Sequence, residues 1–466
     1  MPHMPRNERL AAVERVVKAR ASKRRARAGR AAAAALLFAL AGCATAPVIG
    51  PSVSAVPVAP APPDAAALLQ WHLAAERALP GPPLEAVASV RLLRDGPSAF
   101  RAIFAAIAGA RRRIDLEYFI FQDVESDGVR LGDLLVEKRR QGVAVDLIYD
   151  GIGSLTAGRA FLARLRAAGV AMVAYNPLDP LRSKVPWSPN HRDHRKILVV
   201  DGETAIVGGV NLAKAYESDP LARGRRLSGA RREQLRDADL VFSGPPAARL
   251  EDLFFQTWRA QRGPVQAVPP SVDAPAADPS ASPALPAMRI IDSKPGRLTP
   301  SYYLTLISAI HRAQRSITIA TAFFVPTRDE VAALAEAARR GVDVRLLAPG
   351  HSNSAMSVAV GRSHYGVLLA AGVRIYEYQR GELHSKTVAV DGVWSAIGSS
   401  NLDHRSVVYN DEVDAVILDP DVAAGLEAVF DDDRKAARRI DLPAWRRRGA
   451  GERIKEFLGR FGQALL

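Results

Sequence analysis

Cysteine is nearly missing from this chain, which has a single one, Cys43, among 466 residues. One cysteine excludes an intrachain disulfide framework and leaves no thiolate cluster for a structural zinc site. A strong charge excess is also missing from most of the chain. The net charge is +14, but residues 1–43 contribute +8 of it and the remainder only +6. The basic composition is therefore weak evidence for nucleic-acid binding.

The N-terminus has the features of an export signal. Basic residues up to Arg30 precede an apolar run, 31–42, which is too short to span a bilayer. The run ends in Leu-Ala-Gly before Cys43 and resembles the lipobox of bacterial lipoproteins. We therefore expect a lipoprotein signal peptide over 1–43 and acylation of Cys43; the alternative is an inert buried thiol.

The residue after the cysteine indicates which membrane of the envelope would hold the lipoprotein. Ala44 is not the aspartate that retains lipoproteins at the inner membrane, so the resemblance implies a lipid anchor in the bacterial envelope, on the periplasmic side of the outer membrane. The basic residues 23–25 leave a twin-arginine export signal open as an alternative. Residues 44–80 are expected to form a tether rich in Pro and Ala, followed by a short helix.

Two stretches, 191–211 and 384–401, repeat one pattern of spacings. In each, a histidine is followed by a lysine at the second position, an aspartate at the seventh, and then a glycine and an asparagine. The first set is His194, Lys196, Asp201, Gly208 and Asn211, and the second is His384, Lys386, Asp391, Gly398 and Asn401. A single His-x-Lys is common by chance, but two copies that share all these spacings are a strong signal.

The pattern indicates phosphate chemistry. Each copy is a β-branched apolar run that ends in Asp-Gly, which predicts a strand and a hairpin turn. Alternate side chains share one face of a strand, so each copy offers an imidazole and an ammonium side by side. The imidazole can attack or protonate a phosphate, while lysine, asparagine and backbone amides hold its anionic oxygens.

These stretches resemble the HxKxxxxD motifs of the phospholipase D superfamily, and within it the bacterial cardiolipin synthases. Further support is RDHRK at the first histidine, GGVN after it, GSSNLDHRS after the second motif, and IDLEYFIF upstream. The resemblance extends over about 90–441. It implies one active site in which His194 forms a phosphohistidine and His384 serves as acid and base; the reverse assignment fits the sequence equally well.

Other residues are expected to support the motif residues, with no cofactor. By the resemblance the catalytic set includes Asp201 and Asp391, although their turn positions favour a structural role. Asp237 and Glu412 are expected to orient the histidines, because an imidazole needs its far nitrogen fixed. The remaining expected supporting residues are Gly208, Gly209, Ser399, Asn211, Asn401 and Glu117. Glu117 lies in an apolar strand, so we expect it at the cleft beside a lysine.

A zinc site was weighed against this interpretation. His191, Asp193 and His194 lie close together, and such residues can bind zinc. Lys196 is no ligand, however, and the second copy lacks a histidine and an aspartate at the matching places. The sequence favours a site without metal.

The halves around the motifs repeat as well. Strands alternate with helices, which predicts an α/β fold of two duplicated phospholipase D-like halves, each a mixed β-sheet flanked by helices. Two such halves can pack about a pseudo-twofold axis and share one active site. We expect half 1 over 81–262, a linker over 263–287 and half 2 over 288–441.

The tail, 442–466, is expected to form a basic amphipathic helix. Its apolar residues Ile454, Phe457, Leu458, Phe461 and Leu465 recur at helical spacing after a cluster of arginines. Core packing and contact with anionic lipid are both open interpretations of this pattern.

The sequence therefore predicts a phosphatidyltransferase of cardiolipin synthase type, with a phosphatidylglycerol-like phospholipid as substrate and no obligate protein partner. A hydrolytic phospholipase D would use the same intermediate with water as acceptor. A nuclease is a third possibility, but the mild charge after residue 43 and the expected lipid anchor argue against nucleic acid as the partner.

Overall fold

The computed structural model describes residues 64–218, 234–264, 285–295, 301–352 and 354–461. Residues 51–466 belong to one compact unit, and the separate unit 1–50 lies outside the described residues. Cys43, the expected signal peptide over 1–43 and most of the expected tether therefore lie outside the described residues. Among the described residues, no helix has the length and apolar character needed to cross a membrane.

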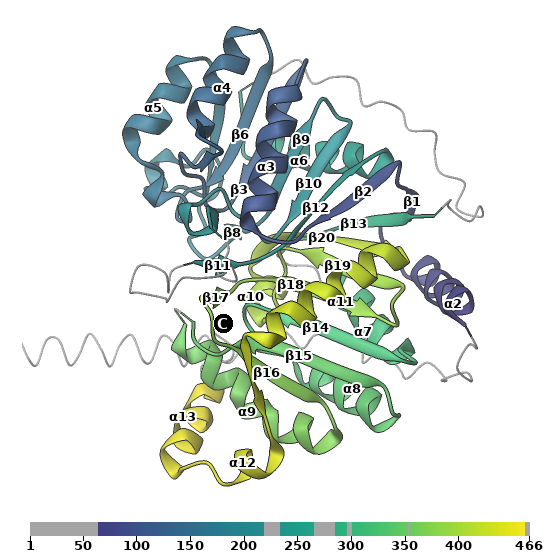
Figure 1. Cartoon of the computed structure of the whole chain (residues 1–466). Helices are drawn as coiled ribbons and strands as arrows, with labels where there is room; N and C mark the ends of the chain where they lie inside the picture. The colour runs from purple at the N-terminus through teal and green to yellow at the C-terminus, as the bar shows by residue number, and fades with distance from the viewer. Residues whose placement is uncertain (1–63, 219–233, 265–284, 296–300, 353, 462–466) are drawn as a thin grey trace, which may run out of the picture. The chain divides into compact units, whose positions relative to one another are not determined.

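The first half is built on a seven-stranded mixed sheet (Figure 1). Its strand order is β2-β12-β10-β9-β3-β6-β7. The strands are β2 (Ser89–Leu93), β3 (Arg113–Tyr118), β6 (Ala144–Asp150), β7 (Ala171–Tyr175), β9 (Lys196–Val200), β10 (Thr204–Gly208) and β12 (Asp239–Ser243). The helices are α3 (Gly96–Gly109), α4 (Leu131–Arg140), α5 (Arg159–Ala167) and α6 (Pro245–Ala260).

The second half repeats this order as β13-β20-β19-β18-β14-β15-β16, with β1 and β21 added at the two edges. The strands are β1 (Glu85–Ala86), β13 (Ala287–Ser293), β14 (Ser316–Thr321), β15 (Asp343–Pro349), β16 (Arg374–Tyr378), β18 (Lys386–Val390), β19 (Trp394–Gly398), β20 (Asn410–Leu418) and β21 (Ala437–Ile440). The helices are α7 (Ser301–Arg312), α8 (Arg328–Arg339), α9 (Ala355–Ala371), α10 (His404–Val408) and α11 (Pro420–Lys435).

Short elements join the two halves. β8 (Arg192–Asp193) pairs in parallel with β20, and β11 (Leu235–Arg236) pairs in parallel with β17 (Glu382–Leu383). A common apolar core lies behind them, with Ile197, Val199 and Leu240 from the first half and Ile397, Val413 and Ala415 from the second. The described remainder is β4 (Glu125–Ser126), β5 (Val129–Arg130), α2 (Ala65–Ala78), α12 (Leu442–Arg446), α13 (Ala450–Phe461) and three short 3-10 turns.

The duplicated α/β fold is the one predicted from the sequence, and most differences are local. The sequence of 128–141 is typical of a helix, but residues 129–130 pair with β4 as a small hairpin and the helix begins at Leu131. The tail forms two helices, α12 and α13, rather than one. The sequence of 237–242 is typical of a strand, but β12 begins only at Asp239, and the residues before 237 pair with β17.

Candidate active site

The first motif enters the site from a short stretch that is tied to the second half. The His194 N–H donates to the carbonyl of Asp411 at 2.9 Å, directly after the β8–β20 pairing. Lys196 is the first residue of β9, and its ammonium donates to the His194 carbonyl. The lysine is almost fully buried, and the His194 side chain is 12% exposed.

The second motif repeats this arrangement from the other side. The His384 N–H donates to the Arg236 carbonyl at 2.8 Å, next to the β11–β17 pairing. Lys386 opens β18, donates to the His384 carbonyl, and lies 2.8 Å from His384 Nδ1. Each motif histidine is thus positioned by backbone of the opposite half.

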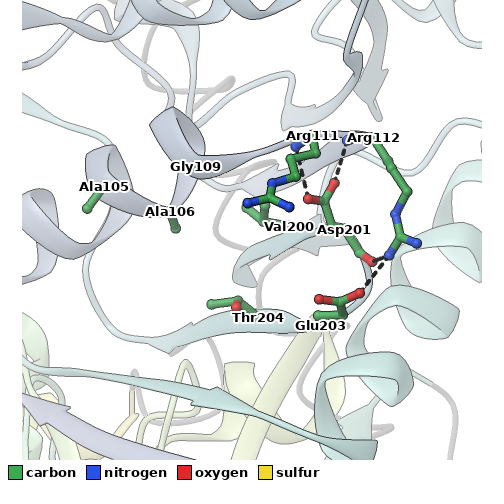
Figure 2. A pocket seen from close by; sticks show the side chains of 9 residues that line it. All are labelled: Ala105, Ala106, Gly109, Arg111, Arg112, Val200, Asp201, Glu203 and Thr204. Carbon is green, nitrogen blue, oxygen red and sulfur yellow. Dashed lines mark hydrogen bonds and ion pairs between the residues drawn. The ribbon is translucent and has the colours of Figure 1, made fainter.

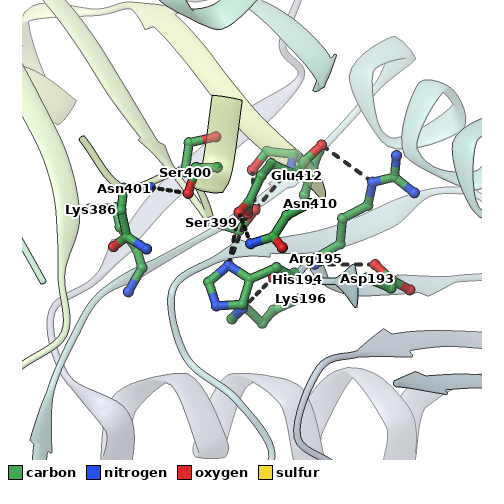
Figure 3. A network of polar contacts seen from close by, with 12 residues as sticks. Asp193, His194, Arg195, Lys196, Lys386, Ser399, Ser400, Asn401, Asn410 and Glu412 are labelled. Carbon is green, nitrogen blue, oxygen red and sulfur yellow. Dashed lines mark hydrogen bonds and ion pairs between the residues drawn. The ribbon is translucent and has the colours of Figure 1, made fainter. Parts of the chain in front are cut away.

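The carboxylates that hold the two imidazoles are exchanged between the halves. His194 Nδ1 of the first half lies 2.9 Å from Glu412 Oε2 of the second (Figure 3). His384 Nδ1 of the second half lies 2.6 Å from Asp237 Oδ2 of the first. With Nδ1 held by a carboxylate, Nε2 of each ring is the nitrogen that can meet a substrate, and Nε2 of His384 also lies 3.3 Å from the Lys386 ammonium. Each imidazole therefore depends on the opposite half for the carboxylate that orients it.

Burial and the paired lysines set the charge state of the site. Burial, followed by Lys386, lowers the pKa of His384 to about 4 against the opposing effect of Asp237. Burial also lowers the pKa of His194, although Glu412 opposes it. Each histidine also feels the lysine of the other motif, which places both motifs in one electrostatic environment. A neutral imidazole is the form needed for nucleophilic attack.

Both motif lysines have pKa values below the ordinary lysine value. Burial lowers the pKa of Lys196 to about 7, and burial lowers the pKa of Lys386 as well. Burial alone would raise the pKa of Glu412, but His194 and Lys196 bring it below its ordinary value. The site therefore combines an ionised Glu412 with lysines that a phosphate anion would stabilise in the charged form.

Carboxylates also explain the motif glycines. A Cβ on Gly209 would lie 2.1 Å from Asp237 Oδ1, and one on Gly208 would lie 2.2 Å from Asp239 Oδ1. Gly398 is confined by Asp414 in the same way. At the position equivalent to Gly209, the second half has Ser399, whose hydroxyl accepts from the Val413 N–H at 2.9 Å. The glycines therefore leave room for the carboxylates that pack against them.

The motif asparagines are buried beside the histidines. Asn211 Oδ1 accepts from the Ile120 N–H at 3.1 Å, and its amide nitrogen lies 3.4 Å from the Tyr216 hydroxyl. Asn401 Oδ1 is buried and has no hydrogen-bond partner among the described residues. A buried acceptor without a partner is costly, so this oxygen is available to a donor group of a ligand, whereas only the amide nitrogen of Asn401 could donate to a phosphate.

The structure does not bring the motif aspartates into the site. Asp201 lies at the far end of β9, about 20 Å from His194 along an extended strand. Its carboxylate accepts from the N–H groups of Arg111, Arg112 and Arg113, beside an open pocket of about 550 Å³ (Figure 2). Asp201 therefore fixes the hairpin against β3, away from the histidine with which the resemblance groups it.

Asp391 has the matching place in the second half and likewise holds a hairpin turn. It accepts from the N–H groups of Gln314, Arg315 and Ser316 at the start of β14. Its second partner is His72 of α2, whose Nε2 lies 2.9 Å from Asp391 Oδ2. A histidine in a short helix after a tether is expected on the helix surface, but His72 is 1% exposed. The α2 helix is therefore bound to the second hairpin.

Glu117 is also displaced from the expected position. It pairs with no lysine; Arg195 Nη1 lies 3.0 Å from its Oε1, and both side chains are fully buried. Arg195 also contacts Asp292 and, through Nε, the carbonyl of Glu412. Glu117 therefore acts behind the site, through an arginine that holds the backbone of the residue bound to His194.

The positions of His191 and Asp193 bear on the zinc alternative. His191 Nε2 lies 3.0 Å from Asp411 Oδ1, whereas Asp193 is packed near Glu117 and Arg195. Among the described residues, no group of three or more His, Cys, Asp and Glu side chains is arranged to hold a metal ion.

Tyr216 is a further residue of the site that the motif spacings do not indicate. Its hydroxyl lies 2.9 Å from His384 Nδ1, although it belongs to the first half. The only signal was its place five residues after Asn211, in the loop that follows the motif. The second half has Ser406 at that spacing, so comparing the two copies could not reveal a shared role.

Comparison with known families agrees with the duplicated architecture. The family described as "Cardiolipin synthase, PLD-like domain" matches residues 103–219 and 306–434, one segment in each half. The cardiolipin synthase of Geobacillus kaustophilus is 34% identical over 387 residues, which cover 82% of this chain and 74% of that protein. The probable cardiolipin synthase of Bacillus subtilis is 31% identical, over 81% of this chain and 72% of that protein.

A solved structure supports the fold. The phosphatidylserine synthase of Haemophilus influenzae aligns with a TM-score of 0.61 at 14% identity. The alignment covers 85% of this chain and all of that protein. At this identity the likeness concerns the fold alone.

Proposed function

Because this chain belongs to the PLD-like family of cardiolipin synthases, we propose that it transfers a phosphatidyl group from one phospholipid to an alcohol acceptor. The observation that carries the proposal is the exchange of carboxylates, Glu412 to His194 and Asp237 to His384. This exchange favours a single site with two oriented imidazoles, as displacement at one phosphorus requires.

The proposed reaction has two displacements. In the first, Nε2 of His194 attacks phosphorus, the bond from phosphorus to the headgroup oxygen breaks, and His384 gives its proton to that oxygen. In the second, His384 takes the proton of the acceptor hydroxyl, the acceptor oxygen attacks phosphorus, and the P–N bond breaks. The histidine is regenerated, so no cofactor is consumed.

Surrounding groups hold the phosphate. Lys196, Lys386 and the asparagines Asn211 and Asn401 supply donors to its non-bridging oxygens, where charge increases in the transition state. The phosphate in turn favours the charged form of both lysines and of His384, which must carry a proton to act as the acid. Substrate binding thus prepares the acid.

A phosphatidylglycerol-like lipid is the proposed substrate, as both donor and acceptor. Hydrolysis is the second candidate function, because water could replace the alcohol at the same intermediate. A nuclease activity has less support, since the charge outside residues 1–43 is only +6. The observation that favours lipid is the identity with cardiolipin synthases over 82% of the chain.

One experiment separates these activities. The purified full chain is incubated with phosphatidylglycerol vesicles and, separately, with supercoiled plasmid. We expect cardiolipin and free glycerol; phosphatidic acid alone would indicate hydrolysis, and nicked plasmid a nuclease. His194→Ala and His384→Ala should each abolish turnover, and full activity in either variant would refute a shared site.

We further propose that the protein is held in the bacterial envelope by acylation of Cys43, at the periplasmic side of the outer membrane. The supporting observation is the Leu-Ala-Gly-Cys sequence after the apolar run, with Ala44 following. Metabolic labelling with a fatty-acid analogue should mark the wild-type chain and not Cys43→Ala. Label that persists in this variant would refute the anchor.

A further inference from the structure

Helix α13 is oriented with its apolar side chains outward. Ile454, Phe457 and Leu458 are 58%, 59% and 60% exposed, whereas the polar Glu456 is only 5% exposed. This is the reverse of the usual amphipathic helix, whose apolar stripe faces the core. The three apolar residues lie at helical spacings of one, three and four, so they form one face.

Specific contacts fix this orientation. Arg448 Nε donates to Glu456 Oε1 at 2.9 Å, which holds the polar side of α13 against the preceding turn. Gly459 faces α9 so closely that a Cβ would lie 3.0 Å from the Ala359 Cβ and 3.1 Å from the Val360 N. Turning the apolar face inward would break the ion pair and push side chains into the position that now only glycine fits.

Positive charge surrounds the apolar face. Between residues 442 and 461 the chain has six Lys or Arg and two Glu. Arg446, Arg447 and Arg453 are exposed, and Arg453 donates to a backbone carbonyl rather than to a carboxylate. Exposed apolar side chains beside such a cluster match an anionic lipid surface, which takes up the apolar groups and attracts the cations.

Helix α13 is connected to the active-site region through α9. Gly361, on the α9 helix that supports α13, would place a Cβ 2.5 Å from the Phe324 carbonyl. Phe324 in turn forms a β-bridge with Leu402, the residue that follows Asn401. One helix and one bridge therefore connect the exposed face with a residue of the phosphate-binding set.

We propose that α13 is a membrane-docking helix, which inserts Ile454, Phe457 and Leu458 into an anionic phospholipid surface and presents the site to lipid there. The inference rests on the proposed function, since the substrate would lie in the same surface. A second copy of the chain is a poorer occupant, because pairing two such faces would bring two basic clusters together.

The test is vesicle sedimentation of the full chain carrying Cys43→Ala, so that acylation cannot hold it to lipid. The variant adds Ile454→Ser, Phe457→Ser and Leu458→Ser, and the matched control adds Leu181→Ser, a side chain that is 93% exposed elsewhere. With vesicles of phosphatidylglycerol and phosphatidylcholine, we expect at least tenfold weaker binding for the triple variant and no change for the control. Equal binding by all three proteins would overturn the proposal.

Two further measurements keep the result interpretable. Arg446→Gln with Arg447→Gln should weaken binding to phosphatidylglycerol vesicles and reduce its salt dependence, while the melting temperature stays within about 2 °C. Unchanged binding in this second variant would contradict the claim that these arginines are attracted to anionic lipid. A dimer that becomes a monomer in the triple variant, with vesicle binding unchanged, would assign the face to a second copy instead.

Failure of docking and failure of the proposed function give different results. The triple variant should retain full turnover of a short-chain phosphatidylglycerol dispersed as monomers, because no residue of the site is changed. Vesicle binding requires no turnover, so a protein that binds lipid but never forms cardiolipin would refute the function and leave docking intact.

Discussion

The hydroxyl of Tyr216, in the first half, lies 2.9 Å from Nδ1 of His384, in the second. Asp237 holds the same nitrogen at 2.6 Å, so Nδ1 of His384 has two oxygen-bearing side chains as partners. Within the described part of the chain, Nδ1 of His194 has the Glu412 carboxylate alone. At the equivalent place of the second half, the Ser406 hydroxyl accepts instead from the Asn401 N–H. The two histidines are thus supported differently, as two distinct chemical roles would require.

Removing this hydroxyl should affect catalysis more than folding. In Tyr216→Phe we expect kcat to fall about fivefold, because a lost hydrogen bond to the imidazole is worth roughly 1 kcal/mol. Tyr149→Phe is the matched control, since its hydroxyl binds Arg166 away from the motifs. Equal rates for the two variants, measured as cardiolipin formation, would show that the tyrosine has no part in positioning His384.

Apart from the histidines, the two exchanged carboxylates are the residues whose substitution should lower kcat the most. Asp237→Asn and Glu412→Gln should each lower kcat by about 10³–10⁴-fold, because the amide favours the wrong tautomer of the imidazole it holds. Asp201→Asn is the comparison, and we expect its rate to stay within tenfold of wild type, since Asp201 binds backbone amides at the hairpin turn. A loss as large in Asp201→Asn would return that residue to the catalytic set.

The sequence predicted the doubled α/β fold and both histidines, because their spacings repeat and local periodicity determines strands and helices. It could not show which half supplies each partner. Asp237 and Glu412 are far from the histidines they bind along the chain, and nothing local encodes that pairing. Glu117 was misplaced for a related reason: burial predicts that a carboxylate needs a cation, but not that the cation is Arg195.

The sequence alone does not distinguish motif residues with a structural role from motif residues that take part in the reaction. Asp391 is part of a recognised motif, yet its partners are backbone amides and His72, which lies more than 300 residues earlier. Such long-range contacts are fixed only by the packing of α2 on the second half. The same packing made the surface assignment of His72 wrong.

The pH dependence of kcat/KM should report Lys196, whose pKa burial lowers to about 7. A lysine is charged below its pKa and neutral above it, so phosphate binding weakens as the pH rises through 7. We expect kcat/KM of the free enzyme to fall on the basic side from about pH 7. In Lys196→Arg the fall should move beyond pH 9, because guanidinium keeps its charge. An unchanged basic limb in this variant would assign the titration to another group.

The contact between α2 and the second hairpin should matter for stability. His72→Ala leaves the buried Asp391 carboxylate without its side-chain partner, so we expect the free energy of unfolding to fall by roughly 1–3 kcal/mol. Arg112→Ala, which removes an exposed contact with Glu203, should cost less than about 1 kcal/mol. Denaturant unfolding followed by circular dichroism compares the two. Equal effects would mean that α2 does not stabilise the second half.

This contact also has a predictable pH dependence. Burial would raise the pKa of Asp391, but His72 and the amides of Arg315 and Ser316 bring it below its ordinary value. A carboxylate with a depressed pKa stabilises the fold above the pKa of the unfolded state, and this stabilisation is lost as the pH falls through the folded pKa. The stability difference between wild type and His72→Ala should therefore shrink below about pH 4.

The central claim is that His194 and His384 act on one phosphorus atom, and single-turnover kinetics with phosphatidyl-p-nitrophenol test it most directly. This leaving group needs no acid, so His384→Ala should release about one equivalent of nitrophenol in a burst and carry the phosphatidyl label on His194. His194→Ala should show no burst. A full burst in both variants, each labelled on its remaining histidine, would mean two independent sites and would contradict the account.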